Sequence, residues 1–242
     1  RRTFSATLAE IYFYYYINSP KYQIFDFIEI INTSVFFCYN IIMNNQSSKG
    51  TFLLTSTGFL NSKVSDKVVK LIGNLSPIKV AIVTTASEGK ETNLYSKLAK
   101  EQLQKMGFLT ADFIDLETQG AGSIINYDVI YVCGGNTFKL LKFARETDFK
   151  TALLKVLGRG GLYIGVSAGS ILIAPSVQIA NEIDPDVNEV EMTNFSGLNI
   201  VDITVYPHYE LKYETEIKDF ELKNNVAITR LTNNQAVMIQ GK

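Results

Sequence analysis

The stretch LYIGVSAGSILIAPS, residues 162–176, decides the fold because it joins two apolar runs through a turn of small residues. The first run predicts a buried strand that ends at Val166, and the second predicts a buried helix. The turn between them fits the G-x-S-x-G nucleophile elbow, in which a strained backbone exposes a serine, here Ser167. A tight turn between two buried elements, without chemistry, is the alternative interpretation.

The same alternation of strands and helices continues on the N-terminal side of this stretch. Apolar, β-branched runs predict strands, and runs with apolar residues at helical spacing predict helices of about ten residues. The expected strands lie at 51–56, 79–86, 111–116, 127–135 and 161–166, and the expected helices at 66–75, 93–108, 136–146 and 149–161. This order predicts an α/β fold, with a mostly parallel sheet covered by helices on both faces.

Composition narrows the class of protein further. Of the 242 residues 46% are apolar and 19% are charged, which is enough for a sizeable core. The net charge of −1 removes the usual electrostatic argument for nucleic acid or an anionic membrane as a partner. The two cysteines, Cys38 and Cys133, do not suggest a disulfide framework, so we expect a reducing compartment, the cytoplasm.

The first 42 residues differ from the remainder of the chain. They are dense in aromatic residues and isoleucine, contain no glycine and show no clear period. Acidic residues interrupt the apolar runs, which argues against both a membrane anchor and an export signal. We therefore expect residues 1–42 to be a non-native or poorly structured extension, and residues 43–242 to be a single α/β domain that starts near Met43.

A second glycine-rich turn, CGGNTF at 133–138, also follows an expected strand. Ligands of parallel sheets bind at the carboxyl ends of the strands, so this turn and the elbow are candidates for one site. Gly134 and Gly135 leave the backbone bare, which lets a peptide N–H approach a substrate oxygen. Asn136 opens the next helix, either as its N-cap or as a substrate-binding side chain. The spacing does not fit the G-x-G-x-x-G dinucleotide fingerprint.

The chain contains a single histidine, His208, which lies directly after an apolar strand and Pro207. A serine nucleophile needs a base, and an imidazole at a strand end is well placed to serve Ser167. A lone histidine is more often a surface or core residue. One histidine and two distant cysteines do not make a typical metal site, and we expect neither a metal nor a cofactor.

Three stretches together resemble the peptidase E (aspartyl dipeptidase) and cyanophycinase group of serine peptidases: YVCGGNTFKLL, LYIGVSAGSIL and GLNIVDITVYPHYE. The resemblance covers about residues 51–241. It implies a class I glutamine amidotransferase-like fold, a three-layer sandwich. It also implies Ser167 as nucleophile, His208 as general base, and the backbone N–H groups of Gly135 and Ala168 as the oxyanion hole.

The chain departs from the family pattern at the third member of the triad. The family has an acidic residue where this chain has Gln235, in the stretch RLTNNQAVMIQG. A second acidic position after the nucleophile helix matches NEIDPD, where Asp184 is the candidate and Glu182 and Asp186 are alternatives. Either Gln235 or Asp184 is expected to orient His208. Lys212 and Arg159 are the guesses for a cation that binds a substrate carboxylate.

The function expected from this resemblance is a serine peptidase that cleaves a small peptide, with an aspartyl dipeptide as one candidate, through an acyl-enzyme on Ser167. The alternatives are a glutamine amidotransferase-like amidase, which would have cysteine at the elbow, and a lipase-type hydrolase. A third alternative is a catalytically weakened or non-enzymatic ligand-binding protein, in which Gln235 has replaced the acidic residue of the triad. The sequence leaves a homodimer open.

Overall fold

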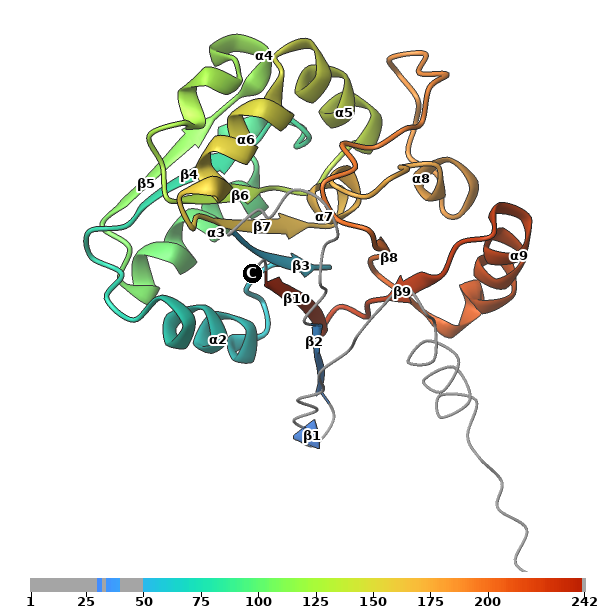
Figure 1. The fold of residues 1–242 in the computed structure, drawn as a ribbon, viewed down its shortest axis with the longest axis horizontal. Coiled ribbons are helices and arrows are strands. Elements are labelled where there is room, and N and C mark those ends of the chain that lie inside the picture. The colour runs from blue at the N-terminus through green and yellow to red at the C-terminus, as the bar shows by residue number, and fades with distance from the viewer. Residues whose placement is uncertain (1–29, 32–33, 40–49, 241–242) are drawn as a thin grey trace, which may run out of the picture.

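The structure is a computed structural model of the chain, and it describes residues 30–31, 34–39 and 50–240 (Figure 1). Within these residues a sheet of eight strands forms the centre of the molecule. Its order is β1 (Ile30–Ile31), β2 (Ser34–Tyr39), β10 (Ala236–Gln240), β3 (Thr51–Thr55), β7 (Leu162–Val166), β6 (Val129–Val132), β4 (Lys79–Val83) and β5 (Thr110–Ile114).

The sheet is mostly parallel, as the alternation of strands and helices predicts. Strands β3, β7, β6, β4 and β5 run parallel to one another, whereas β10 is antiparallel to β3 and parallel to β2. Strand β1 is antiparallel to β2. The carboxyl ends of the five parallel strands therefore lie at one edge, the edge to which ligands bind in such folds.

Side chains of the strands alternate between two separate apolar clusters, one on each face of the sheet. In β4, Ala81 and Val83 join the first cluster, and Val80 and Ile82 join the second. The first cluster contains helices α5 (Thr137–Glu146), α6 (Phe149–Gly158) and α7 (Ala168–Leu172). The second contains α2 (Ser62–Ile72) and α3 (Leu94–Met106), as Figure 1 shows. The predicted three-layer α/β fold is confirmed.

The ends of the helices follow their capping residues. The side chain of Asn61 accepts from the N–H of Lys63 at the start of α2, and α2 ends at Gly73. Helix α3 ends at Gly107, whose φ of 112° is the left-handed conformation that glycine tolerates. A glycine thus ends each of these two helices. The described residues also form the α-helices α4 (Leu116–Gln119), α8 (Ile179–Glu182) and α9 (Glu214–Asn224).

A second, two-stranded sheet lies beside the carboxyl edge of the main sheet. It consists of β8 (Thr204–Tyr206) and β9 (Ile228–Arg230), which are parallel and paired along their whole length. Because the two strands are parallel, the residues that follow them emerge at the same end of the pair. These residues include His208 after β8 and Asn233 after β9.

Most of the expected N-terminal extension, residues 1–42, lies outside the described residues. Of this segment, Ser34–Tyr39 forms β2, whose residue Phe36 pairs with Ala236 of β10. The interpretation of residues 1–42 as an extension, and of residues 43–242 as one domain, stays a prediction. Among the helices of the described part of the chain, none combines the length and apolar character that crossing a bilayer requires.

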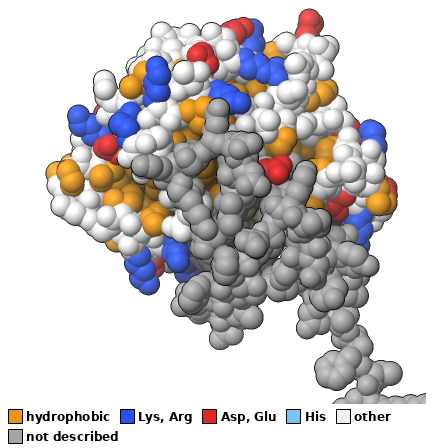
Figure 2. Space-filling model, viewed as in Figure 1, with side chains coloured by type: hydrophobic (Ala, Val, Ile, Leu, Met, Phe, Trp, Pro, Cys, Tyr) orange, Lys and Arg blue, Asp and Glu red, His pale blue; other side chains and the backbone are white. Residues whose placement is uncertain are grey.

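Charged side chains are distributed over the surface. Figure 2 shows Lys and Arg at several separate places on one face of the molecule, with apolar and acidic side chains between them. On the part of this face that is described, the basic side chains do not form one continuous surface. The expectation that nucleic acid is not a partner stays a prediction.

A partly buried ion-pair cluster fixes the small sheet. Arg230, at the end of β9, donates to Glu214 at 3.1 Å and to Glu221 at 2.7 Å, both on α9. Burial would lower the pKa of Arg230, but its hydrogen bonds to Glu221 and Glu214 outweigh this and raise it. The cluster therefore ties α9 to the strand that leads to Asn233.

We expect Arg230→Met to lower the free energy of unfolding by about 3 kcal/mol, because it leaves two partly buried carboxylates without their shared cation. For a domain of this size, the melting temperature should fall by roughly 6–12 °C. Lys218→Met is the matched control, since Lys218 contacts Glu214 from a more exposed position at 3.4 Å. Its effect should stay below about 1 kcal/mol. Equal shifts of the two variants in thermal melts would refute a special role for Arg230.

Candidate active site

Ser167 lies on a strained corner directly after β7. Its φ of 49° and ψ of −112° are unfavourable for a residue with a side chain, and such strain is typical of nucleophile elbows. The N–H of Ser167 donates to the carbonyl of Thr55 at 3.0 Å. The buried hydroxyl of Ser170 bonds to both the N–H and the carbonyl of Thr55. These contacts hold the corner against the end of β3.

Glycine at position 169 lets the helix after the elbow approach the neighbouring strand. A Cβ there would lie 2.4 Å from the carbonyl oxygen of Val132 at the end of β6. Only a residue without a side chain fits this distance. The second glycine of the G-x-S-x-G pattern therefore has a packing reason, and it brings α7 close behind Ser167.

His208 is held in place through its main chain. Its φ of 56° is also in the left-handed region. The N–H of His208 donates to the hydroxyl of Ser56 at 3.1 Å, and this hydroxyl donates to the carbonyl of Leu231 at 2.8 Å. Ser56 follows β3 and Leu231 follows β9. The histidine is thus attached both to the main sheet and to the small sheet.

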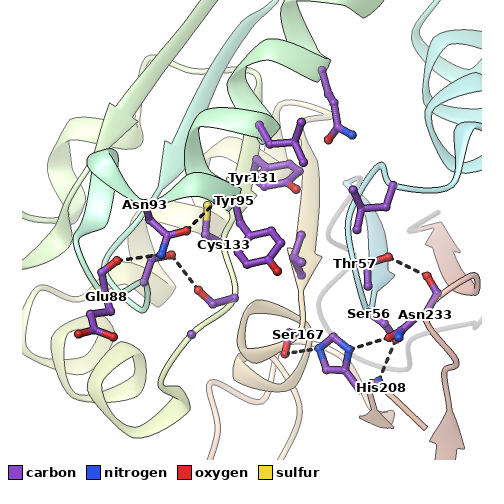
Figure 3. Close-up of a pocket in the computed structure, with 17 residues that line it drawn as sticks. Ser56, Thr57, Glu88, Asn93, Tyr95, Tyr131, Cys133, Ser167, His208 and Asn233 are labelled. Atoms are coloured by element: carbon purple, nitrogen blue, oxygen red, sulfur yellow. Dashed lines mark hydrogen bonds between the residues drawn. The ribbon is translucent and has the colours of Figure 1, made fainter. Parts of the chain in front are cut away.

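The side chains of Ser167, His208 and Asn233 form a continuous hydrogen-bonded row (Figure 3). The Ser167 Oγ lies 3.0 Å from the His208 Nε2, and the His208 Nδ1 lies 2.7 Å from the Asn233 Oδ1. An amide oxygen only accepts, so it favours the imidazole tautomer with its proton on Nδ1. In this tautomer Nε2 is free to accept the proton of the serine hydroxyl.

The structure contradicts the prediction that Gln235 orients His208. The Gln235 Oε1 accepts from the N–H of Thr232 at 2.9 Å and closes the turn between β9 and β10. The partner of the imidazole is Asn233, two residues earlier. The sequence signal was present in the same stretch, LTNNQ, but a tight turn between two strands shifts the contact by two positions.

Asp184 does not orient His208 either. It lines a small cavity that also contacts Ser167 and His208, but the Nδ1 of His208 faces Asn233 instead. The two alternatives are engaged elsewhere. Glu182 pairs with Lys223 at 3.1 Å, and Asp186 accepts from the N–H of Thr137 at 2.8 Å. These acidic residues follow α7 as expected, but none is the third member of the row.

The glycine turn after β6 lies directly against the elbow. A Cβ on Gly134 would lie 3.1 Å from the Cβ of Ser167, and a Cβ on Gly135 would lie 2.0 Å from the carbonyl oxygen of Ala86. Within residues 50–240, the N–H groups of Gly135 and Ala168 donate to no protein acceptor. The geometry thus brings two free main-chain donors to the neighbourhood of Ser167, which is the composition of an oxyanion hole.

Asn136 has a structural role, in contrast to the expectation that it binds substrate. Its Oδ1 accepts from the N–H of Lys139 at 2.9 Å and caps α5. Its Nδ2 donates to the carbonyl of Val187 at 2.6 Å. With both ends of the amide engaged, the side chain binds the loop after α8 to the start of α5. Of the two roles considered for Asn136, the N-cap is confirmed.

Two cavities contact Ser167 and His208. The larger has a volume of about 610 Å³ and extends from Asn233 along the glycine turn to α3. The smaller, about 120 Å³, lies between Gly135 and the segment around Asp184. The nucleophile candidate therefore has a space for substrate on either side of the glycine turn.

The thiol of Cys133 also lines the larger cavity. Burial raises the pKa of this thiol to about 12, and the hydroxyl of Ser96 lies 3.8 Å from its sulfur. At neutral pH the thiol stays protonated and is a weak nucleophile. Ser167, in contrast, has the imidazole of His208 as an adjacent base.

The two cations guessed from the sequence lie away from this site. Arg159 precedes β7 and donates to the carbonyls of Ile125 and Tyr127, so it lies at the opposite edge of the sheet from Ser167. Lys212 is exposed and pairs with Glu210 at 3.2 Å. Neither lines either cavity. No group of three His, Cys, Asp or Glu residues within the described ranges is arranged to hold a metal ion.

The family model and the similar proteins that match this sequence agree with one another. The model of the family described as "Peptidase family S51" matches residues 52–242. A Listeria monocytogenes protein named "Uncharacterized peptidase Lmo0363" is 32% identical over 194 residues, which cover 76% of this chain and 94% of that protein. The protein named "Peptidase E" from Nostoc sp. is 31% identical over 131 residues, or 54% of this chain and 52% of its own length.

Solved structures are similar as well. A crystal structure of a candidate Peptidase E protein from Listeria monocytogenes EGD-e matches with a TM-score of 0.66 and 29% identity, and covers 80% of this chain and 95% of that one. The crystal structure of a peptidase from an acI-B1 Actinobacterium matches with a TM-score of 0.57 and 19% identity, over 78% and 82% of the two chains. The second similarity shows the shared fold.

Proposed function

The chain belongs to peptidase family S51 and is a serine-type peptidase, and from this we propose that Ser167 and His208 cleave a small peptide through an acyl-enzyme. The observation that carries the proposal is the 3.0 Å contact between Ser167 Oγ and His208 Nε2 on a strained strand-to-helix corner. A serine hydroxyl is a weak nucleophile until an adjacent base can take its proton.

In the first step, the Ser167 Oγ attacks the carbonyl carbon of the scissile amide while Nε2 of His208 takes the hydroxyl proton. Negative charge develops on the carbonyl oxygen, and the N–H groups of Gly135 and Ala168 stabilise it. The imidazolium then gives its proton to the leaving amine. This produces the acyl-enzyme, an ester on Ser167.

In the second step, water attacks the ester with His208 again as base, and the acid product leaves with Ser167 restored. Asn233 accepts the Nδ1–H throughout and keeps the ring oriented toward Ser167. It lacks the negative charge with which an aspartate stabilises the imidazolium. We therefore expect turnover that is slower than in an enzyme with a complete Ser-His-Asp triad.

The proposed substrate is a small peptide, and the reaction needs no cofactor. The resemblance to peptidase E makes an aspartyl dipeptide one candidate. The amidase alternative has a cysteine at the elbow, where this chain has Ser167. We propose the cytoplasm as the location, as the cysteine content suggests.

A fluorophosphonate probe tests the activation of Ser167. We expect stoichiometric labelling of the wild-type protein, with the label mapped to Ser167 by mass spectrometry of the peptides. His208→Ala should slow labelling by at least about 100-fold, because the hydroxyl loses its base. A protein that labels at another serine, or labels equally fast without His208, would contradict the proposal.

A further inference from the structure

On the basis of the proposed function, we propose that the acyl residue of the substrate carries a bulky uncharged side chain, and that aspartyl peptides are poor substrates. Two cavities contact Ser167. Ser167 Oγ attacks the carbonyl carbon of the acyl residue, so the acyl side chain lies next to these cavities. The walls of these cavities therefore decide which side chain is accepted.

The larger cavity offers no positive charge to a carboxylate. Among the described residues that line it, none is lysine or arginine, and the charged residue is Glu88, at the side opposite His208 (Figure 3). A carboxylate bound there would lose water without gaining an ion pair, which is strongly unfavourable in a partly enclosed site. Glu88 would repel it in addition.

The neutral polar groups of the larger cavity are already engaged. Five of its described side chains donate a hydrogen bond to a main-chain carbonyl: Ser56, Thr57, Ser87, Asn93 and Gln102. They hold the loops of the site together. The three hydroxyls have no second proton to donate, and each of the two amides keeps one N–H, which is uncharged and forms no ion pair with a substrate carboxylate. The hydroxyls of Tyr95 and Tyr131 and the amide N–H groups of Asn233 remain as uncharged donors, and burial raises the pKa of Tyr131 so that it stays neutral.

The remaining wall is apolar. Leu60, Leu98 and Val166 line the cavity together with the rings of Tyr95 and Tyr131. Leu60 and Tyr95 are 54% and 70% exposed, so the apolar surface continues to the rim. Exposed apolar side chains beside a cavity typically mark the binding of an apolar group. At about 610 Å³, the space accepts a leucine or phenylalanine side chain with room for more of the peptide.

The smaller cavity excludes aspartate for a different reason. Its described lining contains Asp184 and Asp186, without a lysine or arginine, so a third carboxylate would meet two like charges. The larger cavity, at about 610 Å³ against about 120 Å³, also offers far more room for a bulky side chain. A large neutral side chain therefore enters the larger cavity, and an acidic one finds a favourable partner in neither.

The test uses the p-nitroanilides of leucine, asparagine and aspartate, which are similar in size and differ in polarity and charge. We expect kcat/KM to fall in this order, with at least about 100-fold between leucine and aspartate. Leu60→Arg places a cation at the cavity and should reduce the leucine-to-aspartate ratio of kcat/KM at least tenfold. Leu222→Arg on α9 is the matched control, since Leu222 is 82% exposed and lines neither cavity.

An aspartyl substrate cleaved as well as the leucyl substrate would overturn this inference and leave the peptidase function standing. The inference would also be overturned if Leu60→Arg reduced the leucine-to-aspartate ratio of kcat/KM no more than Leu222→Arg does. Failure of the proposed function itself looks different, because Ser167 would then not react with the fluorophosphonate probe.

Discussion

Replacing Ser167 by alanine is expected to lower kcat/KM by about 10⁴-fold or more, to the level left by binding and the oxyanion donors. Without the hydroxyl no acyl-enzyme forms, and His208 has no proton to take. Alanine has nearly the same volume as serine, and the Ser167 N–H still donates to Thr55, so the fold should persist. Steady-state kinetics on the best substrate, with a thermal melt of each variant, measure both quantities.

Ser62→Ala is the matched control for this variant, because Ser62 is exposed at the start of α2, away from both cavities. It should retain wild-type turnover. If Ser167→Ala kept more than about a tenth of wild-type activity at unchanged stability, the nucleophile would have to be another group.

Asn233→Asp should raise kcat at neutral pH by a factor on the order of 10² or more. A carboxylate supplies the negative charge that stabilises the imidazolium formed in both steps, and loss of that charge in a serine triad has cost about 10⁴ in turnover. A carboxylate also presents an acceptor to Nδ1–H in either orientation of the group, whereas an amide does so in only one. The 2.7 Å contact with His208 provides the required geometry.

The adjacent residue supplies a control with the same change of charge. The main-chain carbonyl of Asn234 accepts from the side chain of Asn61, and Asn234 does not line the larger cavity. Asn234→Asp should leave kcat within about twofold of wild type. An equal gain in the two variants would mean that general negative charge acts on the site, and no gain in Asn233→Asp would show that Asn233 does not limit turnover.

The main-chain architecture could be predicted because its signals are local. Apolar β-branched runs gave the parallel strands, and glycines at positions 73 and 107 marked the ends of two helices. Ser167 could be found because an elbow needs small residues in a fixed pattern between a strand and a helix. His208 could be found because it is the single histidine and follows a strand, so no choice among candidates was needed.

The partner of His208 could not be found in the same way. Asn233, Asn234 and Gln235 are all polar and all lie in one turn between β9 and β10, and each can accept a hydrogen bond. Which of them faces the imidazole depends on the shape of the turn, which the Gln235 side chain itself closes. The pairing of β8 with β9 determines which of these side chains faces His208, and this pairing joins residues more than twenty positions apart.

The apolar lining of the larger cavity could not be predicted from the sequence either. Leu60, Leu98 and Val166 come from three separate segments and form one wall only in the folded chain. The charge of Arg159 makes it a candidate for a substrate-binding cation, but charge alone does not show where the side chain lies. Its position before β7 puts it a full strand length from Ser167, because successive strand residues advance about 3.3 Å.

Trapping the acyl-enzyme tests directly whether Ser167 is the nucleophile. The protein is mixed with p-nitrophenyl acetate, whose small acyl group is independent of side-chain specificity, quenched in acid within milliseconds to seconds, and mapped by mass spectrometry. We expect one acetyl group on Ser167 that appears with the burst of p-nitrophenol and is absent from Ser167→Ala. Rapid turnover without acetyl on Ser167, or with acetyl on Cys133 instead, would contradict this expectation.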